Sequence, residues 1–286
     1  WALARQEANA PDLDHQLASV SYAPFGGEVH PDSADAVSAD RIRSDLRTLS
    51  PLTRAVRTYS ATGGVELVPE IANEFGLKVS AGAWIDKFKE RNEREIRSVI
   101  ELAKRHSNVT SIVVGNETIY RDDVTVPELI KMIQRVKRAT GVPVTTGEIW
   151  NVWMEHPELV SAVDYIAVHI LPYWEGFSEQ QVVEQTLLIY DKLRQTYPGK
   201  RIVIAEFGWP SAGYNFQNAN PGRIEQAKVI RDFVSRAYAL GIDNNIVEAI
   251  DQPWKTNEGG VGPYWGLFDA SRQPKLSDKA PPIRAP

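Results

Sequence analysis

The segment Ile202-Val203-Ile204-Ala205-Glu206 is apolar until it ends on a carboxylate. A strand that is apolar at every position is typical of a parallel sheet covered on both faces, because side chains on both sides of the strand are then buried. The run Ile112-Val113-Val114, within the segment 110–115, has the same character, and the segment is followed by Asn116 and Glu117. These two segments predict parallel strands that each deliver an acidic residue to the end of the strand.

The same alternation of short apolar runs and longer amphipathic runs continues along the chain. Strands are expected at residues 19–24, 55–59, 78–83, 110–115, 143–146, 165–169, 202–206 and 246–250. Helices are expected at residues 90–106, 126–140, 179–197 and 224–240, and Gly241 follows the last as a C-cap would.

Eight strands with helical connections predict an α/β fold, namely a (β/α)8 TIM barrel in which residues 1–286 form a single domain. The segment after Trp254 is rich in glycine and proline, so the eighth helix should be short or irregular. Residues 280–286 are expected to form an extended tail.

Composition and spacing exclude several classes of function. The formal net charge of -5 argues against nucleic acid as a partner, and the absence of cysteine excludes disulfides and thiolate chemistry. No apolar run reaches the ~18 residues of a membrane helix, so no membrane insertion of this chain is expected. The five histidines lack metal-ligand spacing, and no glycine-rich nucleotide loop is present, so no metal and no cofactor are predicted.

Glu117 and Glu206 are the candidate catalytic pair. The active site of such a barrel lies at the carboxyl ends of the strands, and these two acids end the fourth and seventh strands across the barrel mouth. A retaining glycosidase needs two carboxyls ~5 Å apart, one protonated and one ionised. The alternative for either residue alone is a structural ion pair with a nearby Arg or Lys.

The aromatic residues favour a sugar substrate. Sugar rings present apolar C–H faces that stack on aromatic platforms, whereas tryptophans of a core would be scattered over the helices as well. The residues at or just after the expected strand ends are Tyr22, Tyr59, Trp84, Trp150, Trp153, Tyr173, Trp174, Trp209, Trp254 and Trp265.

These motifs together resemble glycoside hydrolase family 17. The resemblance rests on Gly115-Asn116-Glu117, on Glu206-Phe207-Gly208-Trp209-Pro210, and on the segment from Glu248 to Phe268. It covers nearly the whole chain and includes the first strand, Val20-Ser21-Tyr22-Ala23-Pro24. The resemblance implies action on β-1,3-glucan, with Glu117 as acid/base and Glu206 as nucleophile.

The resemblance also suggests residues that contact the substrate. It implies that Asn116 binds the sugar 2-hydroxyl, and it matches Asp251 and Lys255 to polar positions near the donor sugar sites. Glu148 and His169 end the fifth and sixth strands, and each either joins the site or fills a structural role. Tyr173 could contact the nucleophile or a sugar, and Arg57 could hold one of the two carboxylates ionised. The other predicted substrate-binding residues are Tyr22, Tyr59, Trp150, Trp153, Trp174, Trp209 and Trp254.

The short span at residues 170–178 lacks the subdomain of plant endoglucanases and indicates a compact, bacterial-type catalytic domain. Compact members of the family include glucosyltransferases, so transfer to a second β-1,3-glucan is favoured over hydrolysis. An endo-β-1,3-glucanase that uses water and a non-catalytic glucan-binding barrel are the alternatives. A monomer is expected that faces the periplasm or the extracellular space. Its origin as a piece of a larger membrane-attached bacterial protein is a further expectation.

Overall fold

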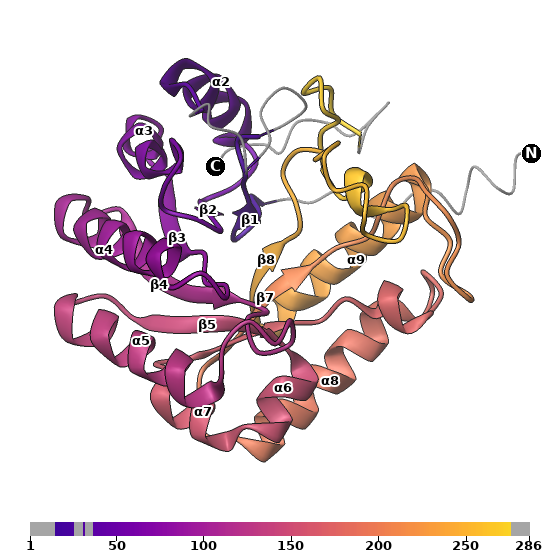
Figure 1. The fold of residues 1–286 in the computed structure, drawn as a ribbon. Coiled ribbons are helices and arrows are strands. Elements are labelled where there is room, and N and C mark those ends of the chain that lie inside the picture. The colour runs from indigo at the N-terminus through magenta and orange to yellow at the C-terminus, as the bar shows by residue number, and fades with distance from the viewer. Residues whose placement is uncertain (1–14, 26–30, 32–36, 276–286) are drawn as a thin grey trace, which may run out of the picture.

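Eight parallel strands form a closed barrel in sequence order (Figure 1). The structure, a computed structural model, describes residues 15–25, 31 and 37–275. Pairing of Val20 with Ile246 joins the first strand to the last and closes the barrel. The strands are β1 (Val20–Ser21), β2 (Ala55–Arg57), β3 (Lys78–Ala83), β4 (Val109–Asn116), β5 (Val144–Ile149), β6 (Ile166–His169), β7 (Ile202–Phe207) and β8 (Asp243–Ile246). The predicted (β/α)8 barrel is confirmed, whereas the predicted tail at 280–286 lies outside the described residues.

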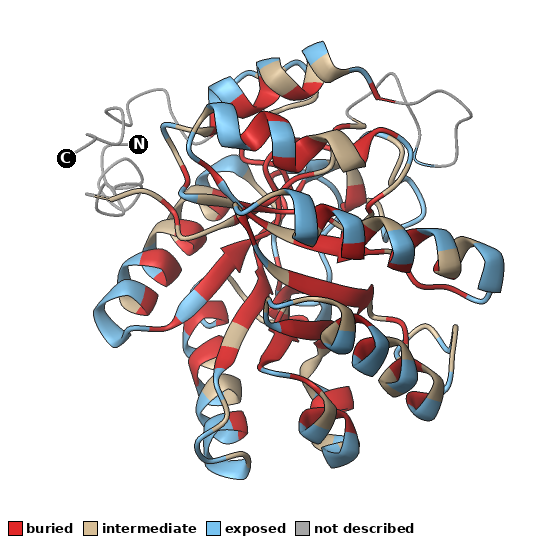
Figure 2. Cartoon of the chain, turned by 90° about the vertical axis from the view of Figure 1, so that its left-hand side faces the viewer, coloured by how far each residue is buried: buried red, intermediate tan, exposed pale blue. Residues whose placement is uncertain are grey.

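Helices surround the strands, with their buried residues turned toward the barrel (Figure 2). They are α2 (Ala39–Leu49), α3 (Val68–Glu74), α4 (Lys89–Arg105), α5 (Val126–Ala139), α6 (Trp150–Glu155), α7 (Pro157–Ala162), α8 (Val182–Thr196) and α9 (Arg223–Leu240). Three short 3-10 helices, η1 (Val65–Leu67), η2 (Pro172–Glu175) and η3 (Gly262–Tyr264), lie in the connections. Over the described part of the chain, no helix has both the length and the apolar character needed to cross a bilayer.

Local sequence signals explain where the long helices begin and end. In α4, Ile96, Val99 and Ile100 are buried at helical spacing. A capping box between Thr125 and Glu128 begins α5. Gly241 ends α9 with a φ of 65°, as the predicted C-cap requires.

The prediction for the eighth strand was displaced. β8 is Asp243–Ile246, whereas residues 246–250 were expected. Its polar residues hid this strand from an analysis of apolar runs. One of them, Asn245, is buried in the barrel, where its amide donates to Ser21 Oγ at 2.7 Å and to the Ala205 carbonyl at 3.0 Å.

Four helices were not among those expected, and three of them, α3, α6 and α7, have only six or seven residues. The eighth connection contains only η3 as helix among the described residues, as the glycine and proline content indicated.

Glu95 on α4 ties the loops after β2 and β3 to the barrel. Its buried carboxylate accepts hydrogen bonds from the backbone N–H of Ala61 at 2.7 Å and of Trp84 at 3.2 Å. The hydroxyls of Ser60 and Thr62 also donate to it. One helical carboxylate therefore holds two loops at the carboxyl end of the barrel.

We expect Glu95→Gln to lower the free energy of unfolding by about 2 kcal/mol, because a neutral amide loses the charge-assisted hydrogen bonds that the carboxylate accepts from two N–H groups and two hydroxyls. Glu93→Gln is the matched control on the same helix. Its partly exposed ion pairs with Arg97 and Arg135 should contribute about 0–1 kcal/mol. Urea unfolding measures both, and equal losses would contradict the assigned role of Glu95.

Candidate active site

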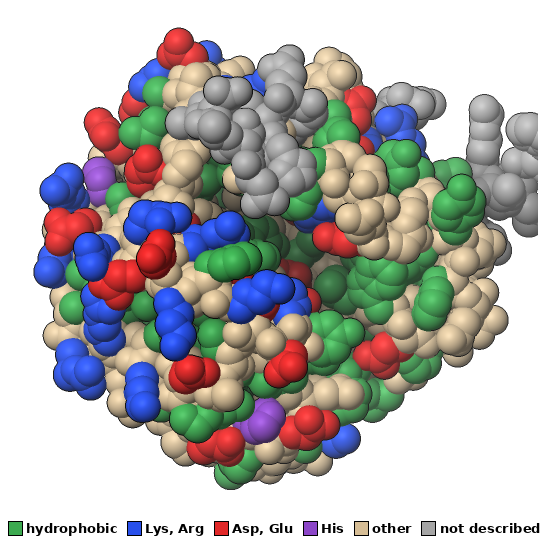
Figure 3. Space-filling model, viewed as in Figure 1, with side chains coloured by type: hydrophobic (Ala, Val, Ile, Leu, Met, Phe, Trp, Pro, Cys, Tyr) green, Lys and Arg blue, Asp and Glu red, His purple; other side chains and the backbone are tan. Residues whose placement is uncertain are grey.

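Glu117 and Glu206 meet at the carboxyl end of the barrel. Glu206 is the penultimate residue of β7, and Glu117 directly follows β4. One carboxylate oxygen of each residue and one ring nitrogen of His169 lie within 4.8 Å of one another. This close approach of two carboxylate oxygens is compatible with the ~5 Å spacing of a retaining carboxyl pair. Figure 3 shows that the molecule is hollowed near the centre of this view, with hydrophobic side chains beside the hollow.

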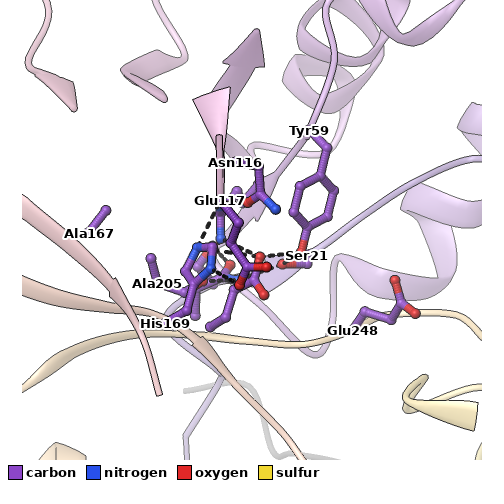
Figure 4. A network of polar contacts seen from close by, with 12 residues as sticks. Ser21, Tyr59, Asn116, Glu117, Ala167, His169, Ala205 and Glu248 are labelled. Carbon is purple, nitrogen blue, oxygen red and sulfur yellow. Dashed lines mark hydrogen bonds and ion pairs between the residues drawn. The ribbon is translucent and has the colours of Figure 1, made fainter. Parts of the chain in front are cut away.

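Glu206 is held by two fixed donors. Arg57 Nη1 donates to Glu206 Oε1 at 3.0 Å, and the Tyr59 hydroxyl donates to the same oxygen at 3.0 Å (Figure 4). Burial and the Glu206 charge raise the pKa of Tyr59 well above its usual range, so the phenol remains a hydrogen-bond donor. Only 8% of the Glu206 side chain is exposed. The buried ion pair with Arg57 therefore fixes the position of this carboxyl.

Arg57 is the shared partner of several site residues. Besides Glu206, its guanidinium donates to the Ala205 carbonyl and to Asn116 Oδ1, both at 2.7 Å. Its Nη2 also lies 3.3 Å from His169 Nε2. One side chain from β2 thus contacts groups that end β4, β6 and β7.

Glu117 has a different environment. Its side chain is 23% exposed, and its carboxylate oxygen lies 2.8 Å from His169 Nδ1 (Figure 4). Burial tends to raise the pKa of Glu117, but the hydrogen bond and charge of His169, with help from Arg121 and Arg57, bring that pKa below its ordinary value. The His169 ring thus lies between the two groups, with Nε2 3.3 Å from Arg57 Nη2 and Nδ1 2.8 Å from the Glu117 carboxylate.

Gly147 on β5 makes room for this network. A Cβ atom at this position would lie 2.7 Å from His169 Nε2 and 2.8 Å from Arg57 Nη2. Any larger residue would displace the two side chains that join the carboxylates. This glycine could not be singled out from the sequence, because the close approach involves side chains from strands β2 and β6.

Lys255 and Glu248 form a second buried pair beside the site. Lys255 Nζ donates to both carboxylate oxygens of Glu248 at 3.1 Å. Burial raises the pKa of Glu248 to about 7 although Lys255 opposes the rise. For Lys255, burial lowers the pKa, but Glu248 and Glu258 more than offset this and leave it above its ordinary value. Glu248 was not predicted as a site residue, yet its place just after a strand was the signal that identified Glu117 and Glu206.

Several predicted sugar-binding residues are buried instead. Tyr22, Trp153 and Trp209 are fully buried, and each donates to a protein acceptor: Asp45, the Ala167 carbonyl and the Asn220 carbonyl. Their rings therefore lack a free face for a sugar, and the prediction that they bind substrate is wrong. These aromatic residues follow the barrel strands because they fill the space between the strands and the helices.

Three further predicted contacts also have structural roles. Tyr173 is buried, and its hydroxyl donates to the Tyr214 carbonyl at 2.6 Å. Asp251 is buried in a pair with Lys275 at 2.6 Å and accepts from the Gly266 N–H. Glu148 is buried, and its carboxylate accepts hydrogen bonds from two backbone N–H groups. None of the three presents a free polar group or ring face to the cleft.

Among the tryptophans predicted to bind substrate, Trp174, Trp150 and Trp254 retain exposed surface. Trp174 is the most accessible of the three, with 39% of its surface exposed, and its ring stacks on Trp265 with centroids 6.0 Å apart. Trp150 and Trp254 are partly buried and donate to Glu175 and Gln252, respectively. These three rings and the partly buried Tyr59 are the predicted substrate-binding aromatics that keep exposed surface.

Glu117, His169 and Glu206 are also spaced so that they could hold a metal ion. However, the Arg57 guanidinium already contacts both His169 and Glu206 and places a positive charge among them. Because this positive charge opposes the binding of a metal ion, Glu117, His169 and Glu206 fit acid–base chemistry better than metal ligation.

A closed parallel barrel with paired carboxylates after β4 and β7 defines a barrel hydrolase of the glycosidase type. The sequence comparison identifies the family. The chain belongs to the BtgE/BtgC glycoside hydrolase domain family, whose model matches residues 19–266.

Individual relatives are fungal. The chain is 29% identical over 273 residues to a glucan 1,3-beta-glucosidase of Arthroderma benhamiae, and the match covers 88% of each protein. It is 28% identical to a probable glucan endo-1,3-beta-glucosidase, btgC, of Aspergillus flavus, over 96% of this chain and 44% of that protein. The chain therefore spans less than half the length of the btgC relative.

Solved structures give the same result. The glycoside hydrolase family 17 beta-1,3-glucanosyltransferase of Rhizomucor miehei aligns with a TM-score of 0.80 and 27% identity, over 91% of this chain and 97% of that one. An active-site mutant of the Rhizomucor miehei beta-1,3-glucanosyltransferase, in complex with laminaritriose, also aligns with a TM-score of 0.80, with 26% identity over 92% and 98% of the two chains. The resemblance to family 17 predicted from the motifs is confirmed.

Proposed function

We propose that this chain is a retaining enzyme that cleaves β-1,3-glucan and transfers the released glycosyl unit to a second glucan. The observation that carries the proposal is that one carboxylate oxygen of Glu117 and one of Glu206 lie within 4.8 Å of each other. The substrate is supported by the glucan-active relatives and by the laminaritriose bound to the Rhizomucor miehei enzyme.

The two environments support different roles for the carboxyls. Two hydrogen bonds, from Arg57 and Tyr59, hold a Glu206 oxygen in one position, as an attacking nucleophile requires. Glu117 has the more exposed side chain of the two, 23% against 8%, as suits a residue that must exchange a proton with the sugar oxygens. We therefore assign Glu206 as nucleophile and Glu117 as acid/base.

The reaction proceeds in two steps. Glu117 gives its proton to the glycosidic oxygen while a Glu206 oxygen attacks the anomeric carbon, so the C–O bond to the leaving glucan breaks and a glycosyl ester forms. Glu117, now ionised, then takes the proton of an acceptor hydroxyl, whose oxygen attacks the same carbon and releases Glu206. Asn116 accepts from Arg57 through Oδ1, which leaves its amide N–H groups to bind the sugar 2-hydroxyl.

The acceptor decides between transfer and hydrolysis. The exposed face of Trp174 supports a sugar acceptor, because a stacked glucan both positions its hydroxyl and excludes water. An endo-β-1,3-glucanase that uses water is the second candidate, favoured by the similarity to a probable glucan endo-1,3-beta-glucosidase, btgC. The monomeric state and the periplasmic or extracellular-facing location predicted from the sequence stay predictions.

We expect Glu206→Gln to lower glucan turnover at least about a thousandfold, because an amide cannot form the glycosyl ester. Glu117→Gln should reduce turnover by about 10²–10⁴-fold through loss of proton transfer. The measurement is product formation from laminari-oligosaccharides, with the exposed Glu155→Gln on α6 as control. Unchanged turnover by the Glu206 variant would refute the nucleophile assignment, and laminarin binding without any turnover by the wild type would indicate a binding barrel.

The pH dependence of kcat/KM should depend on His169. Activity needs protonated Glu117, so kcat/KM falls as pH rises through the pKa of Glu117. His169 lowers that pKa, so His169→Asn should raise it and move the alkaline limb of the profile to higher pH. His156→Asn, which removes a histidine paired with Glu158 away from the site, is the control. An alkaline limb that stays in place in the His169 variant would show that this contact does not set the proton affinity of Glu117.

Trp174→Ala should increase the ratio of hydrolysis products to transfer products by several-fold, because the acceptor loses its stacking face. Mass and linkage analysis of products from one laminari-oligosaccharide measures the ratio. Products longer than the substrate should appear with the wild type. If the wild type yields only shorter sugars, water is the acceptor and the glucanase alternative holds.

A further inference from the structure

Glu148 ends β5 beside the acid/base but contacts protein rather than open cleft. Its side chain is buried, and its two carboxylate oxygens accept from the backbone N–H groups of Ile119 at 2.8 Å and Tyr120 at 3.3 Å. Burial raises the pKa of Glu148 to about 7, although these two hydrogen bonds oppose the rise. A buried carboxyl with this arrangement is costly to keep and needs a structural reason.

The backbone that Glu148 binds is the turn that carries Glu117. Glu117 has a φ of 53°, a left-handed conformation that costs a non-glycine residue about 1–2 kcal/mol. The turn is closed by the Arg121 N–H, which donates to the Glu117 carbonyl at 2.8 Å. The left-handed conformation sets the direction in which the Glu117 side chain leaves the end of β4, so contacts that fix this turn also fix the acid/base.

Strand β5 holds this turn at two points. The Gly147 carbonyl accepts from the Glu117 N–H at 2.7 Å, and the adjacent Glu148 carboxylate accepts from the N–H groups two and three residues further on. The Thr118 hydroxyl adds a weaker bond to the Ile85 carbonyl at 3.3 Å. The carboxylate of Glu148 is therefore the one charged side chain, among the described residues, that bonds the N–H groups of this turn.

Two residues of the active site influence the charge of Glu148. His169 lies on β6 next to β5 and favours the ionised form of Glu148, whereas Glu117 disfavours it. A carboxylate at this position also adds negative charge near Glu117. Like charge favours the protonated form of Glu117, which is the form needed in the first step.

We propose that Glu148 is a positioning residue for the acid/base: by binding the Ile119 and Tyr120 N–H groups, it holds the strained turn that aims Glu117 at the glycosidic oxygen. This inference rests on the proposed function and refines the sequence prediction that Glu148 binds substrate. The proposal assigns Glu148 to proton delivery alone. Loss of the Glu148 carboxylate should therefore lower the rate only when the leaving group needs a proton.

The test compares two substrates that differ in this need. The leaving group of a laminari-oligosaccharide is a poorly acidic sugar alcohol, which needs a proton. The leaving group of 2,4-dinitrophenyl β-laminaribioside is a stable phenolate, which departs without protonation. We expect Glu148→Gln to lower kcat on laminari-oligosaccharides by at least about tenfold with KM within about threefold. The rate of dinitrophenolate release in the first turnover should change by less than about threefold. Glu155→Gln should leave both rates unchanged.

The ratio of the two rates within one preparation does not depend on how much of the protein is folded. It therefore stays informative if Glu148→Gln is unstable, and Glu148→Asp, whose shorter carboxylate cannot reach both N–H groups, should shift the ratio in the same direction. Equal loss on both substrates would overturn the proposal in favour of a general structural role. A rise in KM on both substrates would overturn it in favour of sugar binding.

Two reference variants separate this inference from the proposed function. Glu117→Ala should show the same leaving-group dependence more strongly, and azide should restore its dinitrophenyl turnover by entering the space of the missing carboxyl. Azide should not accelerate Glu148→Gln, because Glu117 still fills that space. If Glu117→Ala lacks leaving-group dependence, the proposed function fails. If only Glu148→Gln lacks it, the positioning role alone fails.

Discussion

Two carboxylates less than 5 Å apart repel each other, and the site depends on how this repulsion is offset. At 4.8 Å, two unit charges in a medium of effective dielectric about 20 repel by roughly 3 kcal/mol. Glu206 is paired with the Arg57 guanidinium, whereas Glu117 is hydrogen-bonded to the His169 imidazole. One carboxyl thereby has a permanent cation as partner, and the other has a ring nitrogen. That asymmetry supports the proposed division into nucleophile and acid/base, although both residues are glutamates.

The closed barrel makes this arrangement possible because parallel strands deliver all their carboxyl ends to one rim. Arg57 reaches across from β2 to groups that end β4, β6 and β7, so the guanidinium couples strands that are distant in sequence. Strand β5 contributes in a different way. Gly147 yields space to Arg57 and His169, and its carbonyl together with the Glu148 carboxylate holds the turn of Glu117. Small and buried residues of β5 thus control residues that meet the substrate.

The position of a strand could be predicted where its sequence is apolar. The prediction failed where the strand carries polar residues. β7 and β4 were evident from unbroken apolar runs, whereas β8 was displaced because Asn245 points into a polar barrel interior. The acidic residues at strand ends were found by the same reasoning, since a carboxylate after a buried strand is conspicuous. The contacts that give those acids their roles join residues such as Arg57 and Gly147, which are far apart in the chain and meet only in the closed barrel.

The aromatic residues show why the sequence alone overestimates the number of sugar-binding rings. Tyr173 packs edge-on against Trp209, Trp265 and Trp174, with centroid separations of 5.5, 5.8 and 5.1 Å. Trp174 in turn stacks on Trp265, and among these four rings it alone keeps substantial exposed surface. Edge-to-face and stacked contacts fix the ring that they support, so a sugar meeting Trp174 would find an indole whose orientation is already set. The buried aromatics therefore serve the cleft indirectly, because they hold one exposed indole rigid.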